Sequence, residues 1–208
     1  MLASISVSEF IDEVAATSPA PGGGSVSALA AALGAALTSM VCHLTIGKKK
    51  YENVQDEMIR ALGQTDELRA KLTDLIDQDT EAFNGVMRAF GMPKETEEQK
   101  LRRSEAIQEA TRDATLVPLE VMKLSEQAIT LAKAVAENGN VNSISDAGVA
   151  GLILKAACEG AAYNVRINLA TLTDTRFVAE TKTLADAMLT NVEILADGIR
   201  EKVEKALS

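Results

Sequence analysis

Aromatic side chains are scarce in this chain of 208 residues: they make up 3% of it, and tryptophan is absent. Because 47% of the residues are nevertheless hydrophobic, the core has to be built from alanine, leucine, valine, isoleucine and methionine. Such side chains favour close packing between helices. The length suits one well-buried domain, and we expect a single domain over residues 1–208.

Positive charge and metal-binding side chains are also in short supply. Against 30 Asp and Glu stand 21 Lys and Arg, which gives a net charge of −9. This balance argues against binding to nucleic acid or to an anionic membrane, since both need a basic surface. The single histidine and the lack of metal-ligand spacing around Cys42 and Cys158 predict no metal site. We interpret both cysteines as reduced and buried in a cytoplasmic protein, and early acidic residues argue against a signal peptide.

No alternation with a period of two is long enough to predict a strand, whereas apolar residues recur at helical spacing. We expect a short helix after a capping box at residues 6–9, and long helices over about 51–90, 96–138, 145–172 and 175–206. Pro118 should kink the helix over 96–138, and Gly139 should end it. The predicted fold class is therefore all-α, a bundle of long helices.

Charge is missing altogether between Glu13 and Lys48, if the histidine is counted as neutral. Residues 25–47 could span a bilayer by length, but their alanine, glycine, serine and threonine side chains insert weakly. We therefore predict no membrane association and a buried small-residue helix, at the centre of the bundle or at a subunit interface.

A loop of sequence PAPGGGS, residues 19–25, precedes this helix. Its prolines give a rigid approach, Gly22, Gly23 and Gly24 permit positive φ values, and Ser25 is a candidate N-cap. A helix N-terminus offers free N–H groups to an anion or to the electron-rich edge of a heterocycle. The alternative interpretation is a flexible hinge ahead of a buried helix.

Asp79 occupies a position on the apolar seam of residues 51–90 where a hydrophobic residue is expected. A carboxylate that faces a core must be paired, protonated or functional. The alternative is an acid turned sideways to solvent or bonded to the end of a neighbouring helix.

Asp146 begins a stripe that continues, at about 100° per residue, through Gly160, Asn164 and Asn168. A stripe with an acid, a glycine and two asparagines among small residues suits either a tightly packed helix or a flat ligand. The alternative role for Asp146 is a helix cap, because Ser143 and Asp146 fit a loose capping box.

Several blocks, spread in order over nearly the whole chain, carry a resemblance to a known family. They are Pro21-Gly22-Gly23-Gly24-Ser25, Leu44-Thr45-Ile46-Gly47-Lys48-Lys49-Lys50-Tyr51, Ala82-Phe83, Met92-Pro93-Lys94, Pro118-Leu119, Ser145-Asp146-Ala147-Gly148-Val149 and Asn164-Val165. The chain resembles the cyclodeaminase family of folate one-carbon enzymes, which includes the cyclodeaminase half of formiminotransferase-cyclodeaminase and stand-alone methenyltetrahydrofolate cyclohydrolases. The resemblance implies an all-helical, dimer-forming enzyme that acts on the carbon bridging N5 and N10 of tetrahydrofolate.

Two reactions fit this resemblance. A stand-alone chain favours the cyclohydrolase, which opens 5,10-methenyltetrahydrofolate to 10-formyltetrahydrofolate. The alternative is a formiminotetrahydrofolate cyclodeaminase that releases ammonia, and a non-catalytic folate-binding or structural helical protein is a third possibility. Neither a metal nor any cofactor beyond the folate substrate is required.

The same chemistry suggests roles for individual residues. We expect Asp146 to act as the acid and base, with Asp79 as second candidate, because a carboxylate can stabilise the methenyl cation and move a proton. Lys48 and Lys50 are expected to hold the glutamate tail, Asn164 the pterin, and the glycine loop to form a backbone wall of the site. A helix over residues 25–47 places its ends roughly 34 Å apart, so one folate should not touch both within a subunit. Either the two clusters belong to sites near a subunit interface of the homodimer, which we expect, or only one is functional and the other is a helix terminus.

Overall fold

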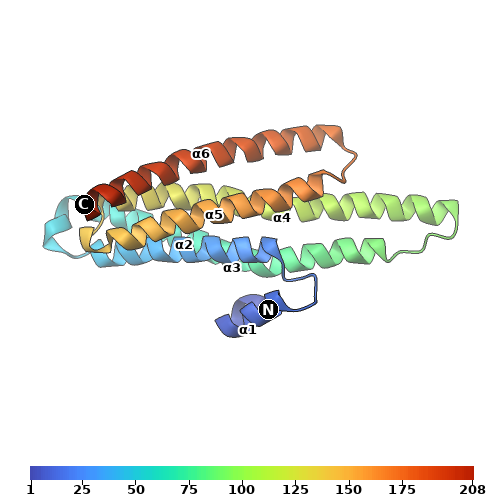
Figure 1. Ribbon diagram of the computed structural model, residues 1–208, viewed down its shortest axis with the longest axis horizontal. Helices are drawn as coiled ribbons and strands as arrows, with labels where there is room; N and C mark the ends of the chain where they lie inside the picture. Colours follow the sequence, from blue (N-terminus) through green and yellow to red (C-terminus); the bar gives the residue numbers. More distant parts are fainter.

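The computed structural model describes all residues, 1–208, and confirms the all-α prediction, with no strand. The long helices lie side by side in an elongated bundle, and the short helix α1 lies apart from them (Figure 1). The helices are α1 (Val7–Ala15), α2 (Gly23–Thr45), α3 (Gln55–Phe90), α4 (Glu97–Asn138), α5 (Ile144–Leu169) and α6 (Thr175–Leu207). Three short 3₁₀ turns, η1 (Leu2–Ser4), η2 (Lys49–Val54) and η3 (Val141–Ser143), complete the chain.

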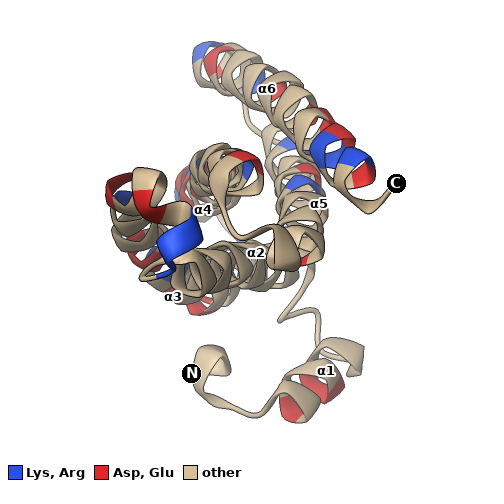
Figure 2. Cartoon of the chain, turned by 90° about the vertical axis from the view of Figure 1, so that its left-hand side faces the viewer, with Lys and Arg blue, Asp and Glu red and all other residues tan.

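Helix α2 packs against α3, α4 and α5 and leaves one apolar face exposed, with Leu33 at its middle. It carries no Asp, Glu, Lys or Arg, and Figure 2 shows the charged residues on the helices around it. Close approach depends on its small residues: a Cβ added to Gly34 would lie 2.5 Å from Cγ of Leu154 on α5. By length and composition α2 could cross a membrane, but 61% of its most apolar window is buried within the bundle. The prediction of a central small-residue helix is confirmed.

Most of the predicted helix ends are confirmed, because they depend on local sequence. Ser6 and Glu9 form a reciprocal capping box at α1, and α4 ends at Gly139. One expectation needs correction: the helix over residues 51–90 begins only at Gln55, after the 3₁₀ turn η2. Helix α4 continues past Pro118, which lies inside it.

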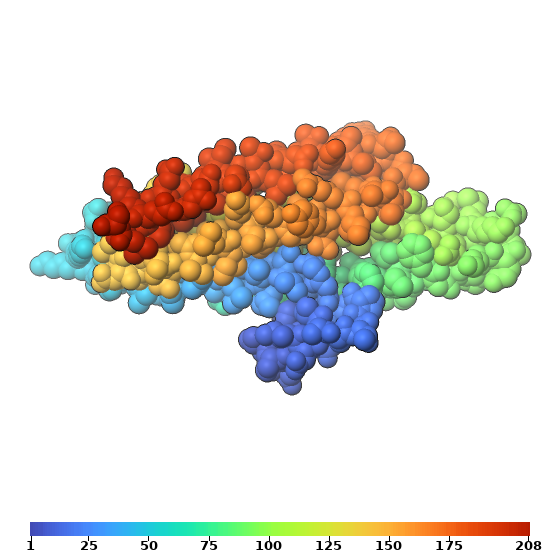
Figure 3. All heavy atoms as spheres, viewed as in Figure 1, coloured from blue at the N-terminus to red at the C-terminus, as the bar shows by residue number.

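The N-terminal segment forms a separate lobe against one side of the bundle (Figure 3). Phe10 of α1 is buried and joins the hydrophobic core, and the backbone N–H of Leu2 donates to the Asp77 carboxylate on α3. Val7 and Ile11 of α1 remain exposed. The loop that leads from this lobe into α2 therefore crosses the bundle surface beside α3, where the candidate site lies.

Candidate functional site

A cavity of about 350 Å³ opens at the N-terminus of α2, between this helix end, α3, α4 and α5. The loop before α2 forms one wall, α3 supplies an acid and an apolar strip, and α4 and α5 close the remaining sides. The lining residues are Pro19, Ala20, Gly22, Gly23, Gly24, Asp79, Phe83, Val86, Phe90, Thr111, Ala114, Asn164, Ile167, Asn168 and Thr171. Asp79 is the only ionisable side chain among them.

Asp79 sits on α3 with its carboxylate against the first turn of α2. The hydroxyl of Ser25 donates to Asp79 Oδ2 over 3.0 Å. Burial raises the pKa of Asp79 above its usual value of 3.8, while hydrogen bonds from the side chain and backbone N–H of Ser25 oppose that rise. A partly buried carboxylate with a raised pKa, in a cavity and without a cation beside it, is suited to accept and release a proton.

The glycine loop makes room for this acid. Helix α2 begins at Gly23, with Gly22 as its N-cap, and a Cβ on Gly24 would overlap the Asp79 carboxylate, whose Cγ lies 2.5 Å from that position. The expectation of positive φ values in this loop is wrong, because only Gly47 has a positive φ. The expectation that Ser25 caps the helix is also wrong, because its hydroxyl is turned to α3. Glycine is needed at position 24 because the Asp79 carboxylate approaches the backbone of α2 closely there.

Two asparagines from α5 complete the polar part of the cavity. The Nδ2 group of Asn164 donates to the carbonyl oxygen of Gly160, and that of Asn168 donates to the carbonyl oxygen of Ala114 on α4, each over 2.9 Å. These bonds hold both amides in place and leave their carbonyl oxygens as free acceptors. The middle of the stripe predicted on α5 faces α2, where Gly160 packs on Ser27. The end of the stripe, with Asn164 and Asn168, faces the cavity.

Sequence reasoning did not assign Asn168, Phe83 or Phe90 to the site. A periodic signal was available, because Asn168 follows Asn164 by one helical turn and Phe83 follows Asp79 by one turn. Phe83 is half-buried and Phe90 is 49% exposed, so the two rings offer apolar surface at the cavity wall and its mouth.

The other predicted site residues lie beyond the far end of α2 from the cavity, where η2 and the start of α5 come together (Figure 1). Lys48 and Lys50 are exposed beyond the C-terminus of α2, and Asp146 is in the first turn of α5. The hydroxyl of Tyr51, beside the lysines, accepts a hydrogen bond from the N–H of Val141, which keeps the lysine turn next to the start of α5. Within one chain the structure therefore forms two groups of candidate residues, separated by roughly the 34 Å length of α2.

Ser143 precedes α5 as its N-cap residue, but its side chain makes no capping bond, so the proposed box with Asp146 does not form. Asp146 is half-buried. The interpretation of Asp146 as the partner of Ser143 in a capping box is therefore wrong.

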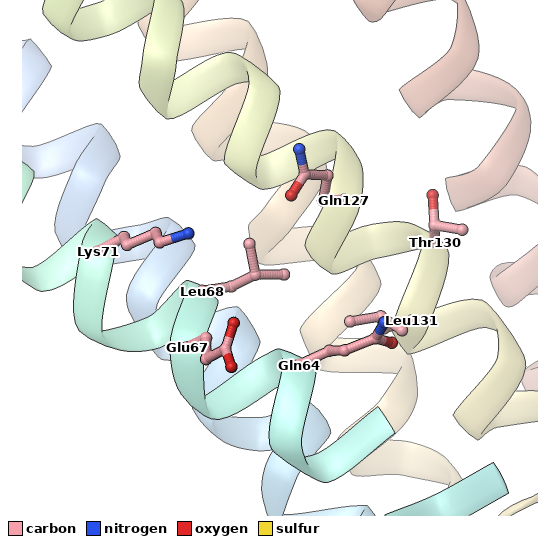
Figure 4. A pocket seen from close by; sticks show the side chains of 7 residues that line it. All are labelled: Gln64, Glu67, Leu68, Lys71, Gln127, Thr130 and Leu131. Atoms are coloured by element: carbon pink, nitrogen blue, oxygen red, sulfur yellow. The ribbon is translucent and has the colours of Figure 1, made fainter. Parts of the chain in front are cut away.

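A second cavity, of about 430 Å³, lies between α3 and α4 and is shown in Figure 4. Its lining is Gln64, Glu67, Leu68, Lys71, Gln127, Thr130 and Leu131. The two charged residues, Glu67 and Lys71, are exposed to solvent, so this groove lacks the partly buried acid of the cavity at α2. No cluster of three or more His, Cys, Asp or Glu side chains that could hold a metal ion occurs in the chain.

The fold and the cavity together define an all-α protein with a candidate small-molecule site built around one partly buried acid. Residues 6–187 match the formiminotransferase-cyclodeaminase family, and the chain belongs to this family. The chain is 44% identical to methenyltetrahydrofolate cyclohydrolase of Methylorubrum extorquens over 97% of both proteins. It is 39% identical to formimidoyltransferase-cyclodeaminase of Rattus norvegicus, of which it covers 34%. The crystal structure of formiminotetrahydrofolate cyclodeaminase from Thermotoga maritima superposes with a TM-score of 0.91 and 31% identity, with full coverage of both chains.

Proposed function

We propose that this chain is a methenyltetrahydrofolate cyclohydrolase, which hydrolyses 5,10-methenyltetrahydrofolate to 10-formyltetrahydrofolate. The observation that carries the proposal is the Asp79 carboxylate, partly buried in a cavity without any cation, in a chain that matches a stand-alone cyclohydrolase over nearly the full length of both proteins. The methenyl carbon belongs to a cationic amidinium, and an anionic carboxylate is its natural counter-ion in a site of low polarity.

Asp79 has two tasks in this reaction. Its ionised form stabilises the substrate cation and accepts a proton from the water that attacks the bridging carbon, as the new C–O bond forms. Asp79 returns this proton to N5 as the bond from that carbon to N5 breaks, and the hydroxyl group on the carbon loses its own proton to solvent as the C=O bond of the formyl group forms on N10. One proton is released to solvent overall. A pKa above the usual aspartate value helps the attack of water, because it makes the carboxylate a better base.

The rest of the cavity suits a fused, flat ring. Phe83, Val86 and Phe90 form the apolar strip of α3, and the amide oxygens of Asn164 and Asn168 are acceptors for N–H groups on the edge of a pterin. In this scheme Gly22, Gly23 and Gly24 form the backbone wall, and no metal or second cofactor takes part.

A cyclodeaminase is the second candidate, and the fully covered cyclodeaminase of Thermotoga maritima specifically favours it. In this reaction N10 attacks the formimino carbon of 5-formiminotetrahydrofolate and its proton passes to the imino nitrogen. Asp79 donates a second proton to that nitrogen, its bond to the carbon breaks, and ammonia leaves. The same carboxylate then balances the methenyl cation that is formed. The two reactions therefore require the same cavity and differ in substrate.

The test is to supply purified protein with each folate and to follow the absorbance of the methenyl compound. Loss of methenyl absorbance faster than in the Asp79→Asn variant supports the cyclohydrolase. A gain of absorbance from the formimino compound, with ammonia released in equal amount, supports the cyclodeaminase. Binding of folate without either change would favour the non-catalytic alternative.

We also propose that the protein is a homodimer in which α2 lies at the subunit interface. Val26, Leu33 and Met40 repeat every seven residues on α2 and are 38%, 52% and 36% exposed. Antiparallel pairing of two copies of this face would bring the Lys48 end of one α2 beside the glycine loop of the other. The lysines and Asp146 of one subunit could then complete the cavity of its partner, with Lys48 and Lys50 for the glutamate tail.

Sedimentation of Leu33→Glu tests this arrangement. We expect the variant to be monomeric, because each copy would place a carboxylate in the middle of the paired faces. Leu101→Glu on α4 is the matched control, since Leu101 is 62% exposed and lies outside the proposed interface. A monomeric wild-type protein would overturn the proposal.

The remaining proposals concern the domain organisation, the cellular location and the partners of the protein. We propose that residues 1–208 work as one domain in the cytoplasm, with folate as the ligand and with neither nucleic acid nor membrane as a partner. The net charge of −9 and the burial of α2 against three other helices support this setting.

A further inference from the structure

The hydroxyl of Ser25 lies directly behind the Asp79 carboxylate. Ser25 is 0% exposed, so it cannot touch a ligand in the cavity. Its Oγ atom lies 3.0 Å from Asp79 Oδ2, 2.9 Å from the carbonyl oxygen of Ile76 and 3.2 Å from Oγ1 of Thr80. A serine hydroxyl has one proton to donate, so it can serve the carboxylate or the carbonyl at any moment, but not both.

We propose that Ser25 is a positioning residue for Asp79, whose hydroxyl donates to the carboxylate when Asp79 is ionised and turns to the Ile76 carbonyl when Asp79 is protonated. The two acceptors are nearly equidistant, so the hydroxyl keeps a hydrogen bond in both states. When it donates to Ile76, its oxygen can accept the new proton of Asp79. Both protonation states of the acid are thus satisfied without movement of the backbone. The inference rests on the proposed function of Asp79 as the acid and base.

No charged side chain competes with the Ser25 hydroxyl for the Asp79 carboxylate. No charged side chain faces Asp79 from the loop before α2, from α2 itself, or from the cavity-lining parts of α4 and α5. Charged neighbours along the chain are directed elsewhere: Asp77 accepts from the N–H of Leu2, Glu81 is exposed, and Arg112 on α4 pairs with Asp174. Two influences on the pKa of Asp79 therefore remain: burial raises it, and the hydrogen bonds from Ser25 lower it.

The test measures the titration of Asp79 itself. Protein with ¹³C-labelled aspartate carboxyls is titrated by NMR, with the Asp79 signal assigned from its loss in Asp79→Asn. We expect Ser25→Ala to move the Asp79 midpoint upward by about one pH unit, because the carboxylate loses a charge-assisted donor. The acid limb of the pH profile of kcat/KM for methenyl hydrolysis should move by the same amount.

Ser27→Ala is the matched control. Ser27 is one helical turn away from Gly23 on α2, is 6% exposed, and donates to the carbonyl oxygen of Gly23 over 2.7 Å without touching Asp79. The same loss of a buried hydroxyl should leave both the Asp79 midpoint and the acid limb unchanged.

A Ser25→Ala variant that melts at lower temperature but titrates like the wild type would overturn the proposal. If Ser25→Ala does not fold, Ser25→Cys keeps the shape of the side chain with a weaker donor, and an unmoved midpoint there would also overturn it. The NMR titration needs no substrate. A wild-type protein without activity on either folate would therefore refute the proposed function while the role of Ser25 is still measured.

Discussion

Replacement of Gly24 by alanine places a methyl group where the Asp79 carboxylate lies. The added Cβ would be 2.5 Å from Cγ of Asp79, whereas carbon atoms in contact prefer about 3.5–4.0 Å. The carboxylate therefore has to retreat by about 1 Å or more, away from the hydroxyl of Ser25. Since a displacement of this size at a reacting group can cost about 100-fold in rate, we expect kcat/KM for methenyl hydrolysis to fall by about that factor.

The effect on stability should be smaller than the effect on rate. Overpacking costs about 1–3 kcal/mol, and alanine returns up to about 1 kcal/mol through its helix propensity. With the full gain in propensity the net loss is about 0–2 kcal/mol, which lowers the Tm of a protein of this size by up to roughly 8 °C.

Kinetics and thermal melts of Gly24→Ala are to be compared with those of Gly63→Ala. Gly63 is an exposed position inside α3 with nothing within 4 Å of an added Cβ, so alanine there should raise stability by about 0.5–1 kcal/mol and leave the rate unchanged. Activity within threefold of wild type in Gly24→Ala would refute the reasoning, because it would mean that the contact between α2 and the carboxylate has no part in catalysis.

Two further predictions concern the buried titratable groups. Because burial raises the pKa of Asp79 in the folded state, protonation favours folding, and the acid lowers stability as the pH rises from about 3.8 through the folded pKa. Asp79→Asn should therefore have a higher Tm than wild type at pH 7, and this difference in Tm should disappear below pH 3.8. A lower Tm at pH 7 would identify Asp79 as a purely structural acid. Burial raises the pKa of the Cys42 and Cys158 thiols to about 11 and about 12, so both should resist a thiol reagent at pH 8 in the native protein and react in denaturant; rapid native labelling would contradict this.

Local patterns in the sequence were sufficient for most of the secondary structure. The capping box at Ser6, the stop at Gly139 and the apolar period of the long helices depend on residues within a few positions of one another. The charge-free run before Lys48 predicted a helix packed among its neighbours for a similar reason, since a helix without a polar face has to bury its apolar surface. Helices α3, α4 and α5 cover most of α2, and the face around Leu33 is open.

The site was only partly predictable, because its contacts join distant residues. The hydrogen bond from Ser25 to Asp79 spans 54 positions, and the local preference of serine for an N-cap gave the wrong role for its hydroxyl. The sequence predicted that the glycine loop belongs to a site. The reason for glycine at position 24, the close approach of Asp79, follows only from tertiary packing.

The stripe on α5 shows where periodicity stops being informative. It placed Asp146 and Asn164 on one face, but it could not tell which end of that face α2 would cover. In the structure α2 packs along the middle of the stripe and leaves the Asn164 end open to the cavity, 18 residues and about 27 Å from Asp146. The roles of Asp146, Lys48 and Lys50 stay predictions that depend on a second subunit.

The most direct test of the account is the steady-state rate of methenyltetrahydrofolate hydrolysis by Asp79→Asn, measured beside wild type and with folding verified by circular dichroism. Asparagine keeps the shape of the side chain but can neither balance the cation nor accept the proton. We expect kcat to fall by a factor on the order of 100 or more in a folded protein. A kcat within threefold of wild type would contradict the central claim that this carboxylate is the acid and base of the site.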